Sequence, residues 1–488
     1  MTALRHFLAI CALTFLSHWA SAAAATSSHS FNWRGQLGAV TRFLETPGKL
    51  NPENCASSID GFADRLERLP SAAFAPHDAD EAAAVAADAP RAFEQFFRIR
   101  LLLKRRLDSF AAPSRACVDA IRRGLRVARF AEDYLADWLH AQGKDQAQVS
   151  SLFGGGAAQV AVNPAFRSAE LRTGDLLLMR GPAFVSALIA RSGDEEGDFS
   201  HLAIVGEDSN GRLYVVEALI AKGVITTPLE EYLEGKEEGR VVLLRYRDPH
   251  VAFTAGRMIY DLAQAAIDSG SPIQYNFRLD RRDNTRLFCA QVIEYAYQLA
   301  TRGRVDLPRY TSTLFKLKQT PVYSALGITS DRTFAPSDIQ LDPRFKIVAE
   351  YRNANYLRKM RHDNVVLTKL LEWMRRGYTI RPNPFSDFIA GFILRVVGRE
   401  EVNENSGLPD KESVALLVGL GRTASALGNI VASIDTRAEA ATGHSMTFRE
   451  LAHEVEALRL QACASAGEAS VVQELMIAPS GACGMATR

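Results

Sequence analysis

The chain has 488 residues, of which 47% are hydrophobic and 23% are charged. This length suits two to four domains, because single hydrophobic cores stop growing near about 250 to 300 residues. The 57 Lys and Arg against 56 Asp and Glu leave a formal charge of +1, so no overall basic field exists to hold nucleic acid. The composition therefore indicates a globular protein of several domains with no nucleic-acid partner.

The first 24 residues have the pattern of a secretory signal peptide. Arg5 precedes an apolar stretch from Phe7 to Leu16, and the small residues Ala20-Ser21-Ala22 follow it. The apolar stretch is shorter than the roughly 20 residues that span a bilayer, which argues against a transmembrane anchor. We expect residues 1–24 to be removed and the mature protein to be exported, either periplasmic or secreted.

The chain has six cysteines, and five remain once Cys11 leaves with the signal peptide. An odd number in an exported protein suggests that one thiol stays free. The simplest pairing joins Cys55 with Cys117 and Cys463 with Cys483, although four cysteines allow three connectivities. A buried free thiol at Cys117 is an alternative. In this scheme Cys289 is the unpaired residue.

Residues 25–160 form a predicted helical N-terminal region, with helical patterns from Asn51 to Gln142. Ser114 is a favourable N-cap. Apolar residues then recur at steps of three or four, at Val118, Ile121, Leu125, Ala128, Ala131, Leu135 and Trp138. This stripe predicts one buried helix face. The Ala-rich stretch from Glu81 to Pro90 is expected to be a loop or a weak helix, and the glycines at 154–156 are expected to form a linker.

Residues 161–352 change to short strands separated by turns, which is typical of an α+β domain. Strands are predicted at 176–179, 201–205, 213–218, 241–246 and 345–348, and helices at 255–267 and from Leu287 onward. Residues 353–488 return to helical patterns, at 355–376, 386–397, 411–434 and 447–460. The segment Phe388–Leu394 is apolar on nearly all sides, so it is either a buried helix or a contact with a membrane surface or lipid substrate.

Several common catalytic motifs are missing from the chain, among them the phosphate-binding loop, the dinucleotide-binding glycine triplet and the His-Glu-x-x-His zinc helix. Gly443-His444-Ser445 begins like the nucleophile turn of serine hydrolases, but Thr447 stands where the closing glycine belongs. These absences disfavour nucleotide-binding, zinc-dependent and serine-hydrolase chemistry.

One cysteine and one histidine remain in positions that suit nucleophilic catalysis. Cys289 lies in the first turn of the helix predicted from Leu287, where unpaired N–H groups stabilise a thiolate and can bind a developing oxyanion. His201 begins a predicted strand, which would hold its imidazole rigidly as a general base. Each alone is a weak indication, because a single His or Cys is more often structural.

Glu217 on the next strand is the candidate to orient His201, and the strand register tests it. A two-residue loop at Asn210-Gly211 would pair residues whose numbers sum to 421, placing His201 and Glu217 on opposite faces. A three-residue loop, Ser209-Asn210-Gly211, makes the sum 420, and the two become diagonal neighbours on one face. Glycine at the third loop position favours the second register.

The central residues resemble a known family. The segments that carry the resemblance are Gly174-Asp175-Leu176-Leu177-Leu178, Phe199-Ser200-His201-Leu202-Ala203-Ile204-Val205, Val216-Glu217-Ala218 with Gly223-Val224, Pro228-Leu229-Glu230-Glu231-Tyr232-Leu233, Tyr275-Asn276-Phe277, Arg286-Leu287-Phe288-Cys289, Ala335-Pro336-Ser337-Asp338 and Phe345-Lys346-Ile347-Val348. They are similar to circularly permuted NlpC-type papain-like hydrolases, the branch with YiiX-like and YaeF-like amidases, in which the His strand precedes the Cys helix. The chain departs from the family in having Ala290-Gln291, where a hydroxyl residue and Glu often follow the Cys.

The resemblance implies a permuted papain-like core in which Cys289 is the nucleophile, His201 the base and Glu217 the third member. It implies an amidase or peptidase, or less readily an esterase, working through an acyl-enzyme without a metal or organic cofactor. Tyr275 and Asp280 are candidates to line the substrate pocket. The substrate would be a cell-wall peptide or a lipid or acyl amide, with the helical flanks covering the cleft or binding a partner.

Two alternatives stay open. In the first, the protein keeps the fold but catalyses no reaction, and acts as a binding or scaffold protein through its helical flanks. In the second, Cys289 forms a disulfide and the similarity is accidental. Retention of both the thiol and the imidazole argues against the first alternative.

Overall fold

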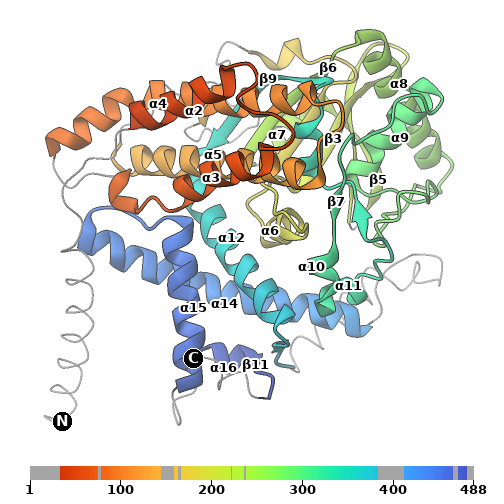
Figure 1. Cartoon of the computed structure of the whole chain (residues 1–488). Helices are drawn as coiled ribbons and strands as arrows, with labels where there is room; N and C mark the ends of the chain where they lie inside the picture. The colour runs from red at the N-terminus through yellow and green to blue at the C-terminus, as the bar shows by residue number, and fades with distance from the viewer. Residues whose placement is uncertain are drawn as a thin grey trace, which may run out of the picture.

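The computed structural model describes residues 33–74, 79–143, 159–162, 166–220, 222–235, 238–382, 411–464 and 471–480. The expected signal peptide, the linker glycines, the apolar segment Phe388–Leu394 and Cys483 lie outside these ranges, and the side chain of Cys463 is also not described. In Figure 1 the N-terminal helices lie beside a central sheet, and the C-terminal helices lie below both.

The centre is a seven-stranded antiparallel sheet, which agrees with the predicted α+β class. Its strands are β1 (Gln159–Val162), β2 (Leu176–Arg180), β3 (His201–Glu207), β4 (Leu213–Leu219), β5 (Gly223–Pro228), β6 (Arg240–Tyr246) and β9 (Phe345–Asn353), in the order β1-β9-β6-β2-β3-β4-β5. The five predicted strands are β2, β3, β4, β6 and β9. The sequence did not predict β1 or β5 as strands, nor the short helices α6 (Phe184–Arg191) and α7 (Leu229–Gly235).

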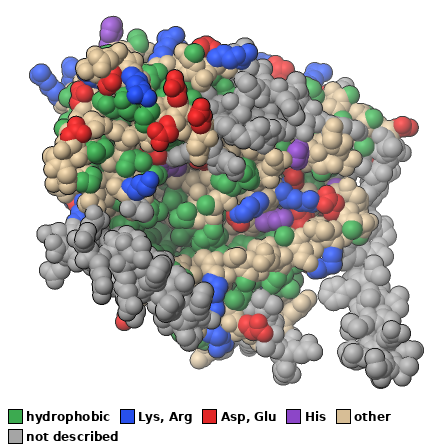
Figure 2. Space-filling view, turned by 180° about the vertical axis from the view of Figure 1, so that it is seen from behind, with side chains coloured by type: hydrophobic (Ala, Val, Ile, Leu, Met, Phe, Trp, Pro, Cys, Tyr) green, Lys and Arg blue, Asp and Glu red, His purple; other side chains and the backbone are tan. Residues whose placement is uncertain are grey.

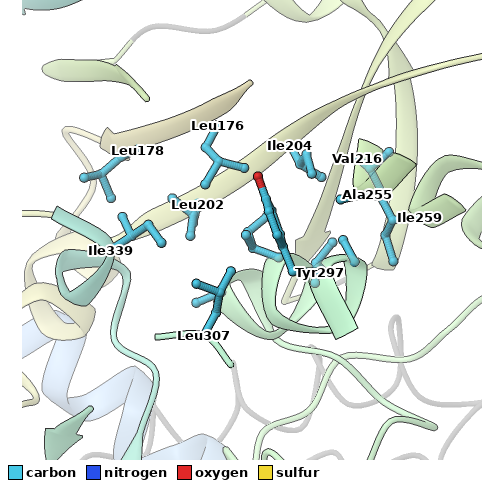
Figure 3. Close-up of a cluster of buried hydrophobic side chains, with 14 of the residues drawn as sticks. Leu176, Leu178, Leu202, Ile204, Val216, Ala255, Ile259, Tyr297, Leu307 and Ile339 are labelled. Carbon is cyan, nitrogen blue, oxygen red and sulfur yellow. The ribbon is translucent and has the colours of Figure 1, made fainter. Parts of the chain in front are cut away.

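Both faces of the sheet are buried. Alternate residues along each strand point to opposite faces and pack into different hydrophobic clusters. Leu178 and Ile204 belong to the cluster that includes residues of α8 (Pro249–Asp268) and α9 (Cys289–Thr301). Figure 3 shows side chains of this cluster between the sheet and the helices, Tyr297 among them. Met179 and Val205 face the other way, toward α7. His201 and Glu217 share the parity of Val205 and Val215, and so lie on the α7 side.

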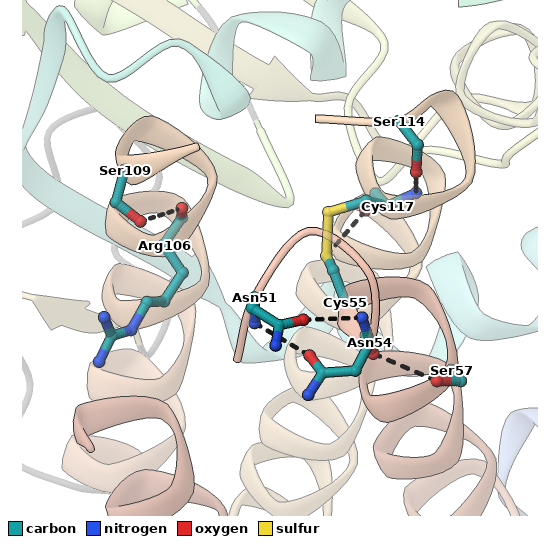
Figure 4. The surroundings of a disulfide bond; sticks show 8 residues. All are labelled: Asn51, Asn54, Cys55, Ser57, Arg106, Ser109, Ser114 and Cys117. Atoms are coloured by element: carbon teal, nitrogen blue, oxygen red, sulfur yellow. Dashed lines mark hydrogen bonds between the residues drawn. A yellow bond between two sulfur atoms is a disulfide. The ribbon is translucent and has the colours of Figure 1, made fainter. Parts of the chain in front are cut away.

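The N-terminal region is a helical layer of α2 (Trp33–Glu45), α3 (Cys55–Glu67), α4 (Ala79–Ser109) and α5 (Arg115–Ala141). The Ser114 side chain accepts a hydrogen bond from the N–H of Cys117 at 3.2 Å, as expected of an N-cap. The predicted Cys55–Cys117 disulfide is present, with the Cα atoms 5.2 Å apart. It joins the beginnings of α3 and α5 (Figure 4), so the alternative of a free buried thiol at Cys117 is wrong.

The expectation of a loop or weak helix at Glu81 to Pro90 was wrong, because α4 runs through this stretch with Pro90 inside it. Alanine has the highest helix propensity, and Pro90 is solvent-exposed. Ala89 and Phe93 pack in a cluster with Leu135 of α5. This packing offsets the cost of about 3 kcal/mol that an interior proline adds.

Buried ion pairs join the N-terminal layer to the central domain. Arg100 on α4 contacts Glu350 on β9 at 2.8 Å and Glu132 on α5 at 3.0 Å. Arg122 on α5 contacts Asp338 at 2.7 Å, in the short 3-10 helix η3 (Pro336–Leu341). A buried charge needs its partner, so these pairs fix how the layer sits on the domain.

The C-terminal region contains α12 (Ala354–Arg375), α14 (Lys411–Thr442) and α15 (Phe448–Ala464), which correspond to three predicted helices, and the short α16 (Val471–Leu475). The remaining described elements are η1 (Ser71–Ala73), η2 (Ser168–Glu170), β7 (Ser312–Thr313), α10 (Phe315–Lys318), α11 (Pro321–Ala325), β8 (Arg332–Thr333), β10 (Thr379–Ile380) and β11 (Met476–Ile477). Within the described ranges, α14 is the one helix long and apolar enough to cross a membrane. Leu420 and Leu427 bury one face of α14 in a cluster with α12, as happens in core helices of soluble proteins too.

Candidate active site

Cys289 is the first residue of α9, two residues later than the predicted helix start at Leu287. Its N-cap, Phe288, has extended backbone angles of φ −91° and ψ 166°. The Cys289 side chain is buried and is not in a disulfide. At a helix start the first N–H groups have no intrahelical acceptor, so their partial positive charge favours a thiolate. Because Cys289 is not in a disulfide, the alternative in which it forms one is wrong.

His201 and Glu217 are in direct contact. His201 Nε2 lies 2.6 Å from Glu217 Oε2, and the Glu217 carboxylate is buried. The register explains the contact: Ile204 pairs with Val216, which is the sum of 420 predicted for the three-residue loop. Gly211 has φ +79°, the left-handed conformation that such a loop requires at this position. The two side chains are diagonal neighbours on one face, as expected.

The thiol of Cys289 lies near the imidazole of His201 and affects its pKa. Burial alone would lower the pKa of His201, but hydrogen bonds and Coulomb attraction from Cys289 and Glu217 outweigh it and raise the pKa to about 10. Because Glu217 occupies Nε2, Nδ1 is the nitrogen left for the sulfur. The three predicted residues therefore lie close together, with His201 in contact with Glu217 and near the thiol of Cys289.

Tyr232 on α7 completes the surroundings of Glu217 and was not predicted. Its hydroxyl donates to Glu217 Oε2 at 3.3 Å. Burial, together with the Glu217 charge, raises the pKa of Tyr232 well above its ordinary value, so the hydroxyl stays protonated and able to donate. The spacing of Leu229, Tyr232 and Leu233 is that of one buried helix face, which is the signal that would have pointed to it.

Of the two pocket candidates, Tyr275 lies near the thiol. Burial and then the charge of Cys289 raise its pKa well above the ordinary value. Asp280 lies in the same loop and is half-buried. Its carboxylate accepts from the backbone N–H of Arg282 at 3.0 Å, so it stabilises the loop. The structure thus brings Tyr275 to the site, and the described contacts of the Asp280 carboxylate lie within its own loop.

Gln291, at the position where the chain departs from the family pattern, connects α9 to that loop. Its Oε1 accepts from Asn276 Nδ2 at 3.0 Å and from the N–H of Phe288 at 3.4 Å. Its Nε2 donates to the carbonyl of Asp283 at 2.9 Å. A neutral amide can both accept and donate here, so Gln291 holds the start of α9 against the loop that carries Tyr275.

The segment before His201 is held by the helical layer and by η3. The Ser337 hydroxyl accepts from the N–H groups of Asp198 and Phe199, both at 3.1 Å. Asp198 pairs with Arg129 of α5 at 2.9 Å. The N-terminal layer therefore contacts the segment that leads into His201, a long-range relation that local sequence patterns do not contain.

The arrangement suits covalent chemistry on a carbonyl group. A thiol beside an imidazole supplies a nucleophile, and the imidazole can hold and return its proton. The backbone N–H groups at the start of α9 are placed to stabilise a negative oxygen. The described residues contain no group of three or more His, Cys, Asp or Glu that could hold a metal ion. A cavity of about 300 Å³ lies elsewhere, between the helical regions and the sheet, and does not include Cys289 or His201.

The central part of the chain is similar to a known family. Residues 170–349 match the family model described as permuted papain-like amidase enzyme, YaeF/YiiX, C92 family. The match confirms the predicted resemblance, and it does not extend to the helical flanks. No curated protein matches.

A solved structure is also similar. It is described as that of the metalloprotein YiiX from Escherichia coli O157:H7, and it shares 22% sequence identity with this chain. The similarity covers 36% of this chain and 96% of the solved one, with a TM-score of 0.27.

Proposed function

We propose that this protein is a cysteine hydrolase that cleaves an amide bond at Cys289, since residues 170–349 match the family model of permuted papain-like amidases. The observation that carries the proposal is the 2.6 Å contact between His201 and Glu217 near the free thiol of Cys289, which affects the pKa of His201. The family match supports a hydrolase of the amidase type. The roles of individual residues are our inference from their geometry.

In this mechanism His201 takes the thiol proton of Cys289 and becomes an imidazolium. The raised pKa of His201 keeps its proton on the ring at neutral pH. The sulfur of Cys289 attacks the substrate carbonyl carbon, and N–H groups at the start of α9 stabilise the oxyanion. His201 gives its proton to the leaving amine, and a thioester forms on Cys289.

Hydrolysis of the thioester completes the cycle. Neutral His201 takes a proton from water, and the resulting hydroxide attacks the acyl carbon. The carbon–sulfur bond breaks, which releases a carboxylic acid and restores the thiolate beside the imidazolium. Throughout, Glu217 keeps His201 oriented and stabilises its charged form, while Tyr232 donates to the same Glu217 oxygen.

For the substrate we propose a cell-wall peptide or a lipid or acyl amide. Figure 2 shows hydrophobic side chains gathered in a hollow on one face of the molecule. The partly exposed apolar helix α14 is compatible with peripheral contact to a membrane. Export is proposed from the N-terminal sequence, and the Cys55–Cys117 disulfide fits an oxidising compartment.

A binding or scaffold protein of the same fold is the alternative. It would keep the domain and use the helical flanks for interaction, without turnover. The assembled Cys289, His201 and Glu217 favour the enzyme, because a binding protein has no need for a thiol held against a charged imidazole.

A thiol-directed chloromethyl ketone tests the proposal. The mature protein is treated with the probe and the adduct is mapped by peptide mass spectrometry, with Cys289→Ala and His201→Ala alongside. We expect a single adduct on Cys289 that is lost in the first variant and forms far more slowly in the second. An unreactive Cys289, or labelling that is unchanged in His201→Ala, contradicts the catalytic assignment.

A further inference from the structure

The cavity of about 300 Å³ lies where the N-terminal helices, the sheet and the C-terminal helices meet. Its volume is at the lower end of the range of about 300 to 1,000 Å³ typical of ligand sites. Most of its lining is apolar, including Phe74 and Phe130 from the N-terminal region and Leu357 and Met360 from α12. None of the lining residues belongs to the catalytic site.

Arg180, the last residue of β2, lines this cavity and is only 2% exposed. Its guanidinium donates to the carbonyl of Gly181 at 2.6 Å and to Asn364 Oδ1 at 3.1 Å, and both acceptors are neutral. In the described part of the chain no carboxylate is in ion-pair contact with it. Asp363 and Asp198 attract it only from farther away, and burial lowers its pKa to about 10.

The carboxylates that line the cavity are already neutralised by other arginines. Glu67 contacts Arg123 at 2.6 Å, and Asp198 contacts Arg129 at 2.9 Å. Asp133 pairs with Arg240 and Arg352. Arg180 is therefore a buried positive charge that has no carboxylate ion-pair partner among the described residues. It lies beside a mainly apolar cavity. Proteins rarely hold such a charge unless a partner compensates it.

We infer that this cavity binds a monocarboxylate with an apolar body, of the fatty-acid class. The carboxylate would accept hydrogen bonds from donors of Arg180, which has five N–H groups and uses two of its nitrogens in the contacts above. The hydrocarbon part would fill the space between Phe130 and Met360. This inference does not depend on the proposed hydrolase activity.

The test measures binding of laurate to the full chain by isothermal titration calorimetry, with 1-dodecanol as the uncharged comparison. Arg180→Met removes the charge and keeps an apolar side chain in the cavity. Arg212→Met removes the same charge from the exposed β3–β4 hairpin and is the matched control. Ala452→Phe narrows the cavity without changing its charge.

We expect saturable binding of one laurate. Arg180→Met should weaken it roughly 10- to 100-fold, the size of effect for a hydrogen bond to a charged group. Arg212→Met should not change it, and Ala452→Phe should weaken laurate and dodecanol alike. Ala452→Phe keeps the test valid if Arg180→Met does not fold.

Alkylation of Cys289 separates this cavity from the catalytic site, and laurate should bind the alkylated protein with unchanged Kd. The inference is overturned if the wild-type chain shows no saturable binding, if Arg180→Met binds laurate as tightly, or if alkylation abolishes binding. None of these results depends on whether Cys289 is catalytic.

Discussion

Glu217 contacts the imidazole of His201, with its Oε2 atom 2.6 Å from Nε2. Both side chains lie on the face of the sheet opposite to α8. The contact exists because β3 and β4 pair with a sum of 420, which makes the two residues diagonal neighbours. A buried carboxylate at this distance favours the charged imidazole. The protonation state of His201 therefore depends on Glu217.

Glu217→Gln should lower the pKa of His201. The wild-type ring, with a pKa raised to about 10, stays protonated through the neutral range and loses its proton only as the pH rises through about 10. Removing the carboxylate charge should move this titration to lower pH, by roughly one to three pH units. The ¹⁵N chemical shifts of the imidazole against pH measure it. Glu230→Gln, on the exposed side of α7, should leave the titration unchanged.

Gly211 sets the register that brings the two residues together. A side chain at Gly211 meets no atom within 4 Å, so any cost of substitution comes from its φ of +79°. Gly211→Val should lower the free energy of unfolding by about 1 to 2 kcal/mol, whereas Gly211→Asn should cost less, because Asn tolerates this conformation. Urea unfolding measures both. Equal stability of the two variants would show that the left-handed conformation does not limit the hairpin.

Gln291→Ala should weaken the start of α9. It removes the acceptor of Asn276 and of the Phe288 N–H, and the donor to the Asp283 carbonyl, all within a buried region. Buried groups left without partners cost about 1 to 3 kcal/mol, so we expect a loss of that size in urea unfolding. The alkylation rate of Cys289 by iodoacetamide should change as well. Gln298→Ala, later on the same helix, should change neither.

The Cys55–Cys117 disulfide should stabilise the N-terminal layer. It closes a loop of 62 residues, for which loop-closure entropy predicts about 4 kcal/mol. The double variant Cys55→Ser, Cys117→Ser should lose stability of that order in a Cys289→Ala background, which removes interference from the free thiol. Urea unfolding with and without dithiothreitol measures it. Identical curves for the oxidised and reduced protein would contradict the prediction.

Local patterns predicted much of the central sheet and the contact between His201 and Glu217. Apolar runs bounded by turn residues gave β2, β3 and β4, and the glycine at 211 selected the register. We could propose the pair from one cysteine at a helix start and one histidine at a strand start. The first turn of a helix and the first residue of a strand each hold a side chain in a defined direction. The family match over residues 170–349 agrees with the resemblance seen in the sequence.

The rest depends on contacts between distant segments. Arg122 on α5 contacts Asp338, and Arg129 contacts Asp198 shortly before His201, yet neither pair is visible as a spacing in the sequence. The Ala-rich start of α4 was misjudged for the same reason, because packing against α5 and α12 outweighs Pro90. Arg180 gave no local signal, since its significance lies in the lack of a carboxylate in ion-pair contact with it among the described residues.

The most direct test of the account is detection of an acyl group on Cys289. The mature protein is mixed with an activated acyl donor such as a p-nitrophenyl ester, quenched with acid within seconds and examined by intact and peptide mass spectrometry. We predict one acyl group, on the peptide that contains Cys289, which disappears with time in the wild type and does not form in Cys289→Ala. Acylation at another residue, or no acylation of a folded protein that retains its thiol, would contradict the assignment of Cys289 as the nucleophile.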